Sequence, residues 1–474
     1  MQLQVSLSRY LQLEFELKNN LQQTFELIME VLRAVLLILV VMTIHGESEA
    51  FQNNTNYDEA KIPTYQLPEL LTCNNGTRVE TKADWTDKRR GEILQLFKEH
   101  VYGAMPAAPA QNVRSQFVVV KEVTIKAKID PRGGGDDTVT VRMKEVKIFL
   151  GANKLGQEKS GPVVNLLLFL PARSAVASTS YPIFLAYNFN GNHTVHESPE
   201  ITKSDTWSRD GKKLTPGDKT RGGASSRWPI GMIVEQGYAV GTMYYGDVDP
   251  DFDDGFKNGV HSLFPKLQDR PDNWTSIGGW AWAAQRVMDY FENDSDIDQK
   301  RVALLGHSRL GKTALWAGAT DERFALVISN NSGCGGAALA RRQFGETVSR
   351  INQKFPHWFC AKHKDYGGNE NEMPVDQHML IALMAPRPVY IASAKEDRWA
   401  DPRGEFLSAY HAEAAWNLFD EKGLGLTEPQ MPATERLIGH RIGYHIRNGK
   451  HDVTEYDWKA FLNFFGRNAN YQSR

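Results

Sequence analysis

Short apolar runs alternate with amphipathic stretches over most of this chain. Continuous apolar runs indicate strands buried on both faces, and apolar positions recurring every three or four residues indicate helices packed on them. The predicted strands are Val163–Leu170, Ile183–Tyr187, Ala239–Tyr244, Val302–Leu305, Ala325–Ser329 and Val389–Ala394. The predicted helices are Ile277–Glu292, Lys312–Ala319, Gly404–Phe419 and Glu455–Phe465. This alternation predicts an α/β fold, a three-layer sandwich around a mostly parallel sheet.

The region before residue 150 has a different pattern. A helix is predicted over Lys88–Val101, because its apolar positions fall on one stripe. Gln116–Ile129 and Thr138–Leu150 are rich in β-forming residues and are separated by the turn sequence Pro131–Gly135. We therefore expect an antiparallel hairpin at one edge of the sheet.

The N-terminus has the pattern of a leader segment. Ala34–Ile44 is a long apolar run that is short for a membrane span and fits the apolar core of a signal peptide, with Ser48-Glu49-Ala50 as a plausible cleavage site. Glutamates upstream do not fit a signal peptide, so an overextended start, with Met29 as the true first residue, is one alternative and a membrane anchor is another. We treat residues 1–50 as the leader and residues 51–474 as one catalytic domain, secreted or periplasmic.

The composition argues against some classes of function but does not identify one. The 474 residues are 41% hydrophobic and carry a formal net charge of −2, which suits one large α/β domain and gives no support for nucleic-acid binding. The three cysteines, Cys73, Cys334 and Cys360, form no ligand cluster, although a Cys334–Cys360 bridge would be possible in an oxidising compartment.

One strand–turn–helix stretch carries the strongest candidate for chemistry. Residues 300–316 have the pattern of an apolar strand, a tight turn around Ser308 and an amphipathic helix. α/β-Hydrolases expose a nucleophilic serine on such a turn and use a backbone N–H at the helix start for the oxyanion. The usual G-x-S-x-G spacing is not kept, because Leu310 occupies the second glycine position and Gly311 follows it. An ordinary turn with a helix-capping serine is the alternative interpretation.

An acid and a histidine follow Ser308 in the order that this fold requires. Asp397 comes shortly after the predicted strand Val389–Ala394, and His451 lies in a glycine-containing loop before the last helix. In a triad, the histidine takes the serine proton and returns it to the leaving alcohol, while the carboxylate fixes the histidine tautomer. Taken singly, Asp397 also fits a turn former and His451 a surface loop residue. Together they predict a Ser308–His451–Asp397 triad.

Several motifs in register resemble one known family. Gly306–Lys312 is similar to the G-x-S-R-x-G-K motif of glucuronoyl esterases, carbohydrate esterase family 15. The segments that resemble bacterial members are Asn330–Ala338, Phe355–Phe359, Asp376–His378, Ala385–Pro388 and Trp399–Phe406. The likeness runs from about Trp85 to the C-terminus.

The resemblance implies a substrate and a set of site residues. The substrate class is the ester between 4-O-methyl-glucuronic acid on glucuronoxylan and a lignin alcohol, cleaved without a metal or organic cofactor. The family assigns Arg309, a fork of charged donors, to the oxyanion. It assigns Lys312, Glu346 and Trp399 to the uronate. By themselves, Lys312 and Glu346 would pass for solvated charges and Trp399 for core packing.

The triad acid departs from the fungal pattern. Fungal members carry a glutamate after the strand that follows the nucleophile helix, where this sequence has Asn331. Because an asparagine cannot hold the charge that stabilises an imidazolium, we expect Asp397 to take the role, with Glu396 and Asp401 as neighbouring rivals.

Other functions are open at this point. The chain fits a serine esterase acting on acetyl or feruloyl groups of xylan, and also a non-catalytic carbohydrate-binding relative. We expect the polysaccharide ester as the main partner, no nucleic acid, no membrane partner apart from the alternative N-terminal anchor, and a monomer. His193, in a loop near the oxyanion region, stays unassigned between a site residue and a solvated one.

Overall fold

The computed structural model describes residues 29–30, 32–33, 55–106, 116–130, 137–151, 161–172 and 180–468. Met1–Asn56 forms one unit and Tyr57–Arg474 forms another. The apolar run and cleavage site predicted for the leader lie outside the described residues, as does the turn of the predicted hairpin. Within the described ranges, no helix combines the length and apolar content needed to cross a membrane.

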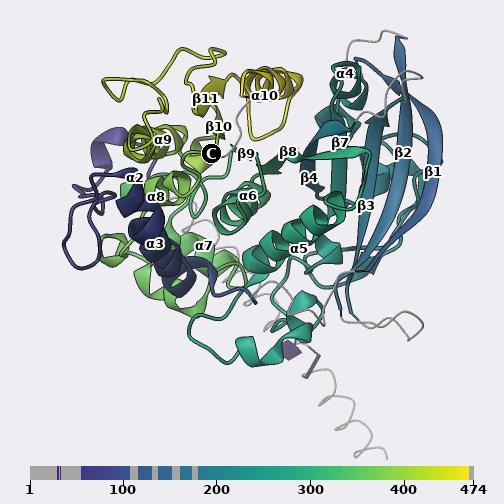
Figure 1. Ribbon diagram of the computed structural model, residues 1–474. Coiled ribbons are helices and arrows are strands. Elements are labelled where there is room, and N and C mark those ends of the chain that lie inside the picture. The colour runs from purple at the N-terminus through teal and green to yellow at the C-terminus, as the bar shows by residue number, and fades with distance from the viewer. Residues whose placement is uncertain are drawn as a thin grey trace, which may run out of the picture. The chain divides into compact units, whose positions relative to one another are not determined.

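The second unit is built on one sheet (Figure 1). Its strands are β1 (Gln116–Lys128), β2 (Thr138–Phe149), β3 (Val163–Pro171), β4 (Tyr181–Asn188), β7 (Ala239–Tyr244), β8 (Ile297–His307), β9 (Leu326–Asn330), β10 (Val389–Ala394) and β11 (Ile442–Arg447). They lie side by side in the order β1-β2-β3-β7-β4-β8-β9-β10-β11. Pairing is antiparallel from β1 to β7 and parallel from β7 to β11. The predicted antiparallel edge and mostly parallel centre are therefore confirmed.

Helices cover both faces of this sheet. The hydrophobic cluster on one face draws on α3 (Arg90–Phe97), α5 (Ser276–Phe291), α6 (Arg309–Thr320), α7 (Val348–Lys354), α8 (Gln377–Ala382) and α9 (Pro402–Asn417). The cluster on the other face draws on α4 (Ile230–Glu235) and α10 (Glu455–Arg467). The predicted three-layer sandwich is the observed architecture.

The central strands show why their sequences are apolar throughout. In β8, Val302 and Leu304 belong to one hydrophobic cluster, whereas Ala303 and Leu305 belong to the other. Successive side chains of a strand point to opposite faces, so a strand covered on both sides needs apolar residues at every position. This is the pattern that predicted the parallel sheet.

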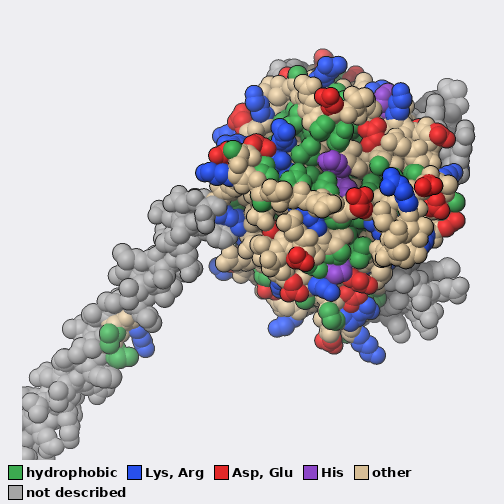
Figure 2. Space-filling model, turned by 90° about the vertical axis from the view of Figure 1, so that its left-hand side faces the viewer, with side chains coloured by type: hydrophobic (Ala, Val, Ile, Leu, Met, Phe, Trp, Pro, Cys, Tyr) green, Lys and Arg blue, Asp and Glu red, His purple; other side chains and the backbone are tan. Residues whose placement is uncertain are grey.

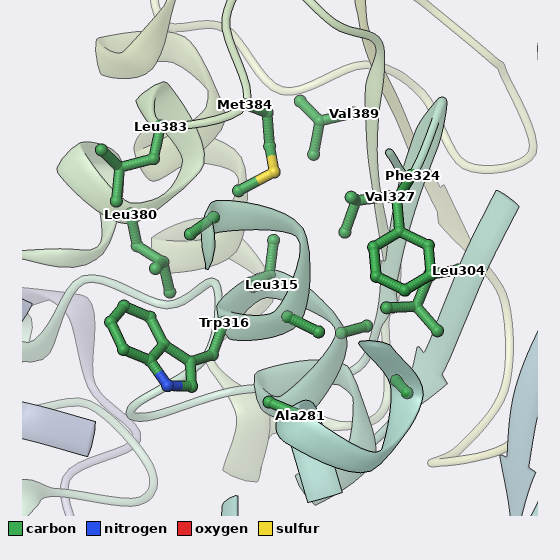
Figure 3. Close-up of a cluster of buried hydrophobic side chains, with 14 of the residues drawn as sticks. Ala281, Leu304, Leu315, Trp316, Phe324, Val327, Leu380, Leu383, Met384 and Val389 are labelled. Atoms are coloured by element: carbon green, nitrogen blue, oxygen red, sulfur yellow. The ribbon is translucent and has the colours of Figure 1, made fainter. Parts of the chain in front are cut away.

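Helix α6, which begins directly after Ser308, is anchored in the core (Figure 3). Leu315 and Trp316 are fully buried and lie between the sheet and helix α8. Burying a large apolar side chain contributes about 1.5–3 kcal/mol. The start of α6 is therefore held by packing over the whole length of the helix.

The N-terminal helix departs from the uniform helix that its pattern predicts. The helical stretch consists of α2 (Lys82–Asp84), a π-helical turn over Trp85–Arg89, α3, and a second π-helical turn over Lys98–Tyr102. Two smaller features were not predicted. They are a ribbon of β5 (Thr206–Trp207) with β6 (Lys213–Leu214), and short 3-10 turns such as Asn192–Thr194, Tyr245–Asp247, Ala340–Arg342 and Arg398–Ala400.

The surface matches the balanced charge of the sequence. On the face shown in Figure 2, Lys and Arg side chains are interspersed with Asp and Glu, and histidine side chains lie among hydrophobic ones nearer the middle. The mixture of signs is what a net charge of −2 predicts for 55 basic and 57 acidic side chains.

Candidate active site

Ser308 occupies a strained turn between β8 and α6. Its backbone angles, φ 59° and ψ −129°, lie in a region that residues other than glycine rarely adopt. The backbone N–H of Ser308 donates to the carbonyl of Asn330 on β9, 2.9 Å away, which ties the turn to the neighbouring strand. The backbone N–H of Arg309 begins the helix and has no acceptor within it by helical geometry. The turn therefore presents a hydroxyl beside a free helix N-terminus.

Two close approaches explain the unusual glycine spacing. A Cβ on Gly306 would meet the carbonyl oxygen of Leu310 at 1.8 Å, and a Cβ on Gly311 would meet the Cβ of Ser332 at 2.8 Å. Leu310 itself is fully buried in the core. The second glycine is therefore needed one position later than in G-x-S-x-G, where the helix touches the loop after β9.

Asp397 and His451 are brought together from distant parts of the chain. Nδ1 of His451 donates to Oδ2 of Asp397 across 2.6 Å. The Asp397 side chain is 5% exposed and that of His451 is 42% exposed. A buried carboxylate thus holds an imidazole whose other edge reaches solvent.

Asn331, at the position of the fungal glutamate, also contacts this acid. Its Nδ2 donates to the same Oδ2 of Asp397 at 2.9 Å. The two rival acids have different surroundings. Glu396 is exposed, and Asp401 pairs with Arg342, whose Nε lies 2.8 Å from Oδ2 of Asp401. Of the three acids, only Asp397 contacts His451.

His307 lies between the serine turn and this pair. Its ring centroid is 4.4 Å from that of His451, and its Nδ1 donates to Oδ1 of Asn330 at 2.7 Å. Burial, followed by the neighbouring charge of His451, lowers the pKa of His307 well below its usual value. His307 is therefore neutral at physiological pH and packs against His451 without competing for a proton.

Ser308 and His451 are near each other but not hydrogen-bonded. Within the described ranges, no hydrogen bond joins the Ser308 hydroxyl to His451, although the ring of His307, which precedes the serine, lies 4.4 Å from that of His451 and is tilted by 40° to it. Such bonds are often long in enzymes without substrate and tighten when substrate binds.

Arg309 lies in a cage of aromatic rings. Its guanidinium carbon is 5.3 Å from the Phe189 ring centroid, 5.9 Å from that of Tyr245 and 5.3 Å from that of Trp358. One amino group, Nη1, lies 3.3 Å from Oδ2 of Asp251. Its Nε is buried and has no hydrogen-bond partner in the described part of the chain. The charged Arg309 guanidinium is therefore held beside Ser308, and its Nε–H has no acceptor among the described residues.

Lys312, Glu346 and Trp399 form a second cluster. The ammonium of Lys312 donates to the carbonyls of Ser332 and Cys334, at 2.5 and 2.6 Å, and lies 3.8 Å from Oε2 of Glu346. The backbone N–H of Glu346 donates to the carbonyl of Trp399 at 3.0 Å. Lys312 is buried and not a solvated helix lysine.

The acid of this cluster is protonated more easily than an ordinary glutamate. Burial raises the pKa of Glu346, and the charge of Lys312 and a side-chain hydrogen bond from Trp399 oppose the shift without cancelling it.

Three further features of the sequence can now be placed. His193 is buried and its Nε2 lies 2.9 Å from the hydroxyl of Thr220, so it packs in its loop. The cysteines Cys73, Cys334 and Cys360 are buried free thiols, so the Cys334–Cys360 bridge is not formed. In the described ranges, no group of three or more His, Cys, Asp or Glu side chains is arranged to hold a metal ion.

The sequence did not point to Asp251, which contacts Arg309. No motif marks it, and Trp358 was noted only as part of a family-like segment. Asp251 can be recognised as part of the site only in the folded structure, which brings the loop after β7 against the segment Phe355–Phe359.

The sheet order, the strand–Ser308–helix turn and the acid–histidine pair that follows later strands define an α/β-hydrolase. The model of the family "Glucuronyl esterase, fungi" matches residues 231–420. A carbohydrate esterase, MZ0003, from an unknown prokaryote is 45% identical over 442 residues, which cover 91% of this chain and 96% of the relative.

Solved structures agree with the sequence matches. A glucuronoyl esterase from Solibacter usitatus superposes with a TM-score of 0.77 at 43% identity, covering 86% of this chain and 99% of that one. A promiscuous family 15 esterase from a marine bacterial metagenome gives 0.76 at 44% identity, covering 88% and 100%. The chain belongs to the glucuronoyl esterases, carbohydrate esterase family 15.

Proposed function

We propose that this enzyme cleaves the ester between 4-O-methyl-glucuronic acid on glucuronoxylan and a lignin alcohol, with Ser308, His451 and Asp397 as its triad. The observation that carries the proposal is the 2.6 Å hydrogen bond from His451 to Asp397, next to the turn that exposes Ser308. The family assignment supports the uronate ester, and the exposed edge of His451 supports a proton acceptor open to substrate.

In the first half of the reaction, the Ser308 oxygen attacks the ester carbonyl and His451 takes the hydroxyl proton at Nε2. Asp397 holds Nδ1–H and stabilises the imidazolium. The carbonyl oxygen becomes an anion that accepts from the backbone N–H and the guanidinium of Arg309. When the intermediate collapses, the bond to the alcohol oxygen breaks and the alcohol leaves with the proton from His451.

In the second half, water attacks the acyl-enzyme. His451 takes a proton from the water, and the collapse of the second tetrahedral intermediate returns that proton to Ser308. The product is the free uronic acid, which ionises to the uronate by releasing its proton to solvent. Lys312, Glu346 and Trp399 bind the uronate ring in this proposal, because an ammonium, a carboxylate and an indole match sugar hydroxyls and an apolar ring face. No step calls on a metal or organic cofactor.

Comparing hydrolysis of benzyl and methyl glucuronate by the wild type with that by two variants tests this proposal. Ser308→Ala should lower kcat by at least about 10³-fold, and Asp397→Ala should also lose activity. Labelling of the wild type by a fluorophosphonate, absent in Ser308→Ala, identifies the nucleophile. A Ser308→Ala variant that keeps its activity would exclude the mechanism.

A second substrate class is favoured by one of the comparisons. The metagenomic relative is described as promiscuous, so hydrolysis of acetylated xylan and of feruloyl esters should be measured beside that of glucuronate esters. If kcat/KM for either of these substrates exceeds that for benzyl glucuronate, the enzyme is an acetyl xylan or feruloyl esterase.

We also propose that residues 1–50 direct export, and that the mature enzyme is a secreted or periplasmic monomer. N-terminal sequencing of the exported chain tests the first point, and cleavage near Ala50 is the expected result. Light scattering of the purified enzyme tests the second. A chain that stays in the membrane fraction would favour the anchor.

A further inference from the structure

Asp251 is a buried carboxylate whose partners come from four parts of the chain. Its side chain is 2% exposed. Oδ1 accepts from Nε1 of Trp358 at 2.7 Å and from Nε2 of His357 at 3.0 Å. Oδ2 faces Nη1 of Arg309 at 3.3 Å and accepts from the Tyr245 hydroxyl at 3.4 Å. The nearest other cation is Arg209, whose Nη2 lies 3.8 Å from Oδ2.

These contacts keep Asp251 ionised. Burial raises the pKa of a carboxyl group, but here the hydrogen bond from His357 and the charge of Arg309 outweigh burial, so the pKa of Asp251 lies below its usual value. A negative charge therefore stands beside the guanidinium of Arg309 at neutral pH.

Asp251 and the aromatic rings restrict Arg309 in different ways. The rings of Phe189 and Trp358, each 5.3 Å from the guanidinium carbon, pack around it but give it no hydrogen-bonding direction. The carboxylate fixes the end that carries Nη1. Trp358 joins both restraints, because its ring packs on Arg309 and its N–H holds Asp251.

We propose that Asp251 is the positioning residue for the oxyanion arginine: it fixes the Arg309 guanidinium before substrate arrives. This inference rests on the proposed role of Arg309 in the reaction. Asp251 does not touch the reacting atoms and acts only through Arg309. A displacement of about 1 Å in a group that stabilises the transition state can cost up to about 100-fold in rate.

The loop after β7, which carries Asp251, also offers a matched control residue. Asp249, two residues earlier, is also buried, and its Oδ1 lies 3.2 Å from Nδ1 of His261. It has no contact with Arg309 among the described residues. Asp249→Asn and Asp251→Asn therefore each remove one charge from a buried Asp–His pair of the same loop, but only the second loosens the arginine.

The test measures kcat and KM for benzyl glucuronate in the full chain. Asp251→Asn should lower kcat by about 10- to 100-fold and leave KM within about threefold, because the interaction it supports forms in the transition state. Asp249→Asn should keep kcat within about threefold. Thermal unfolding of every variant shows whether each one is folded.

A double-mutant cycle with Arg309→Gln separates positioning from a general structural effect. If Asp251 acts through Arg309, adding Asp251→Asn to Arg309→Gln should lower kcat by no more than about twofold further. If the two losses multiply, Asp251 acts elsewhere and the inference is overturned. His357→Phe, which removes one N–H from Asp251 and leaves the rings around Arg309 unchanged, provides the same cycle if Asp251→Asn does not fold, with an expected loss of about tenfold.

The possible failures are distinguishable. If Arg309→Gln keeps wild-type kcat, the proposed oxyanion role fails and the Asp251 inference fails with it. If Arg309→Gln loses activity while Asp251→Asn is folded and fully active, only the Asp251 inference is overturned.

Discussion

Two Asp–His pairs use histidines that are close together in the sequence, His445 and His451, and they differ in almost every respect. His451 and Asp397 meet at the end of the sheet, and the His451 side chain is 42% exposed. His445 and Asp457 meet in the interior, 2.9 Å apart at Nε2 and Oδ1, and both side chains are fully buried.

The number of partners separates the pairs further. His445 uses both ring nitrogens, because its Nδ1 lies 2.7 Å from the Tyr390 hydroxyl. Asp457 also accepts from Nε of Arg447 at 2.8 Å and caps helix α10 through Thr454. His451 uses Nδ1 alone, and its Nε2 has no partner among the described residues.

The difference shows that an acid–histidine contact is not by itself a catalytic signature. A fully satisfied, buried pair holds β11 to α10, whereas a pair with one open nitrogen is able to exchange a proton with substrate. The buried His445–Asp457 network also supports the His451–Asp397 pair, since Nη2 of Arg447 donates to the carbonyl of Asp452, next to His451, at 2.6 Å.

The largest expected effect is a loss of activity when the His451–Asp397 pair is broken. His451→Ala should lower kcat on benzyl glucuronate by at least about 10³-fold, because the proton of Ser308 loses its acceptor, and should leave the melting temperature nearly unchanged. His440→Ala, at an exposed histidine, is the control and should stay fully active. If His451→Ala retains activity, the contrast between the pairs disappears.

Breaking the buried His445–Asp457 pair should instead lower the stability of the fold. Asp457→Asn removes a buried charge that faces Arg447 and His445, so the free energy of unfolding should fall by about 3 kcal/mol. Urea unfolding measures the loss. Glu455→Gln on the same helix breaks only a surface pair with Lys459 and should cost less than about 1 kcal/mol. A loss of kcat in Asp457→Asn without a loss of stability would contradict this assignment.

A third buried acid, Glu405, has neither a histidine nor a cation as a hydrogen-bond partner among the residues that the structure describes. Glu405 is fully buried and accepts from the N–H of Gly333 at 3.0 Å and the hydroxyl of Ser393 at 2.6 Å. Burial raises its pKa to about 8 in the folded state, above the usual 4.5. The folded state therefore binds the proton more tightly, and the stability from this group is full at low pH and is lost as pH rises towards 8.

Comparing Glu405→Gln with the wild type isolates that pH dependence. Between pH 5 and pH 8, the unfolding free energy of the wild type should fall relative to the variant by about 1.4 kcal/mol per pH unit. Urea unfolding at several pH values gives the slope. A difference that does not change with pH would show that Glu405 is ionised in the folded enzyme.

The smallest effect is expected at Asn331. Its Nδ2 donates to Asp397, and a hydrogen bond to a charged group contributes about 1.5–3 kcal/mol. Asn331→Ala should therefore lower kcat by about tenfold and leave KM unchanged, as initial rates over a range of benzyl glucuronate concentrations will show. An unchanged kcat would mean that His451 alone holds the acid.

The sequence by itself determined the layered α/β fold, the antiparallel edge and most strand bounds. Two strands, Ala239–Tyr244 and Val389–Ala394, have the predicted ends. Apolar runs reveal such elements because burial on both faces leaves a local pattern. The π-helical turns near Trp85 were missed, since their hydrogen bonds leave no mark in the apolar periodicity.

At the site, the sequence pointed to Ser308, Asp397 and His451 through their order along the chain. Only the tertiary structure shows that His451 contacts Asp397 and neither of its neighbouring acids, gives Asn331 a partner and places Asp251 against Arg309. These contacts join residues from separate loops, so no local pattern encodes them. Which of two Asp–His pairs keeps a free nitrogen likewise depends on what the fold packs against it.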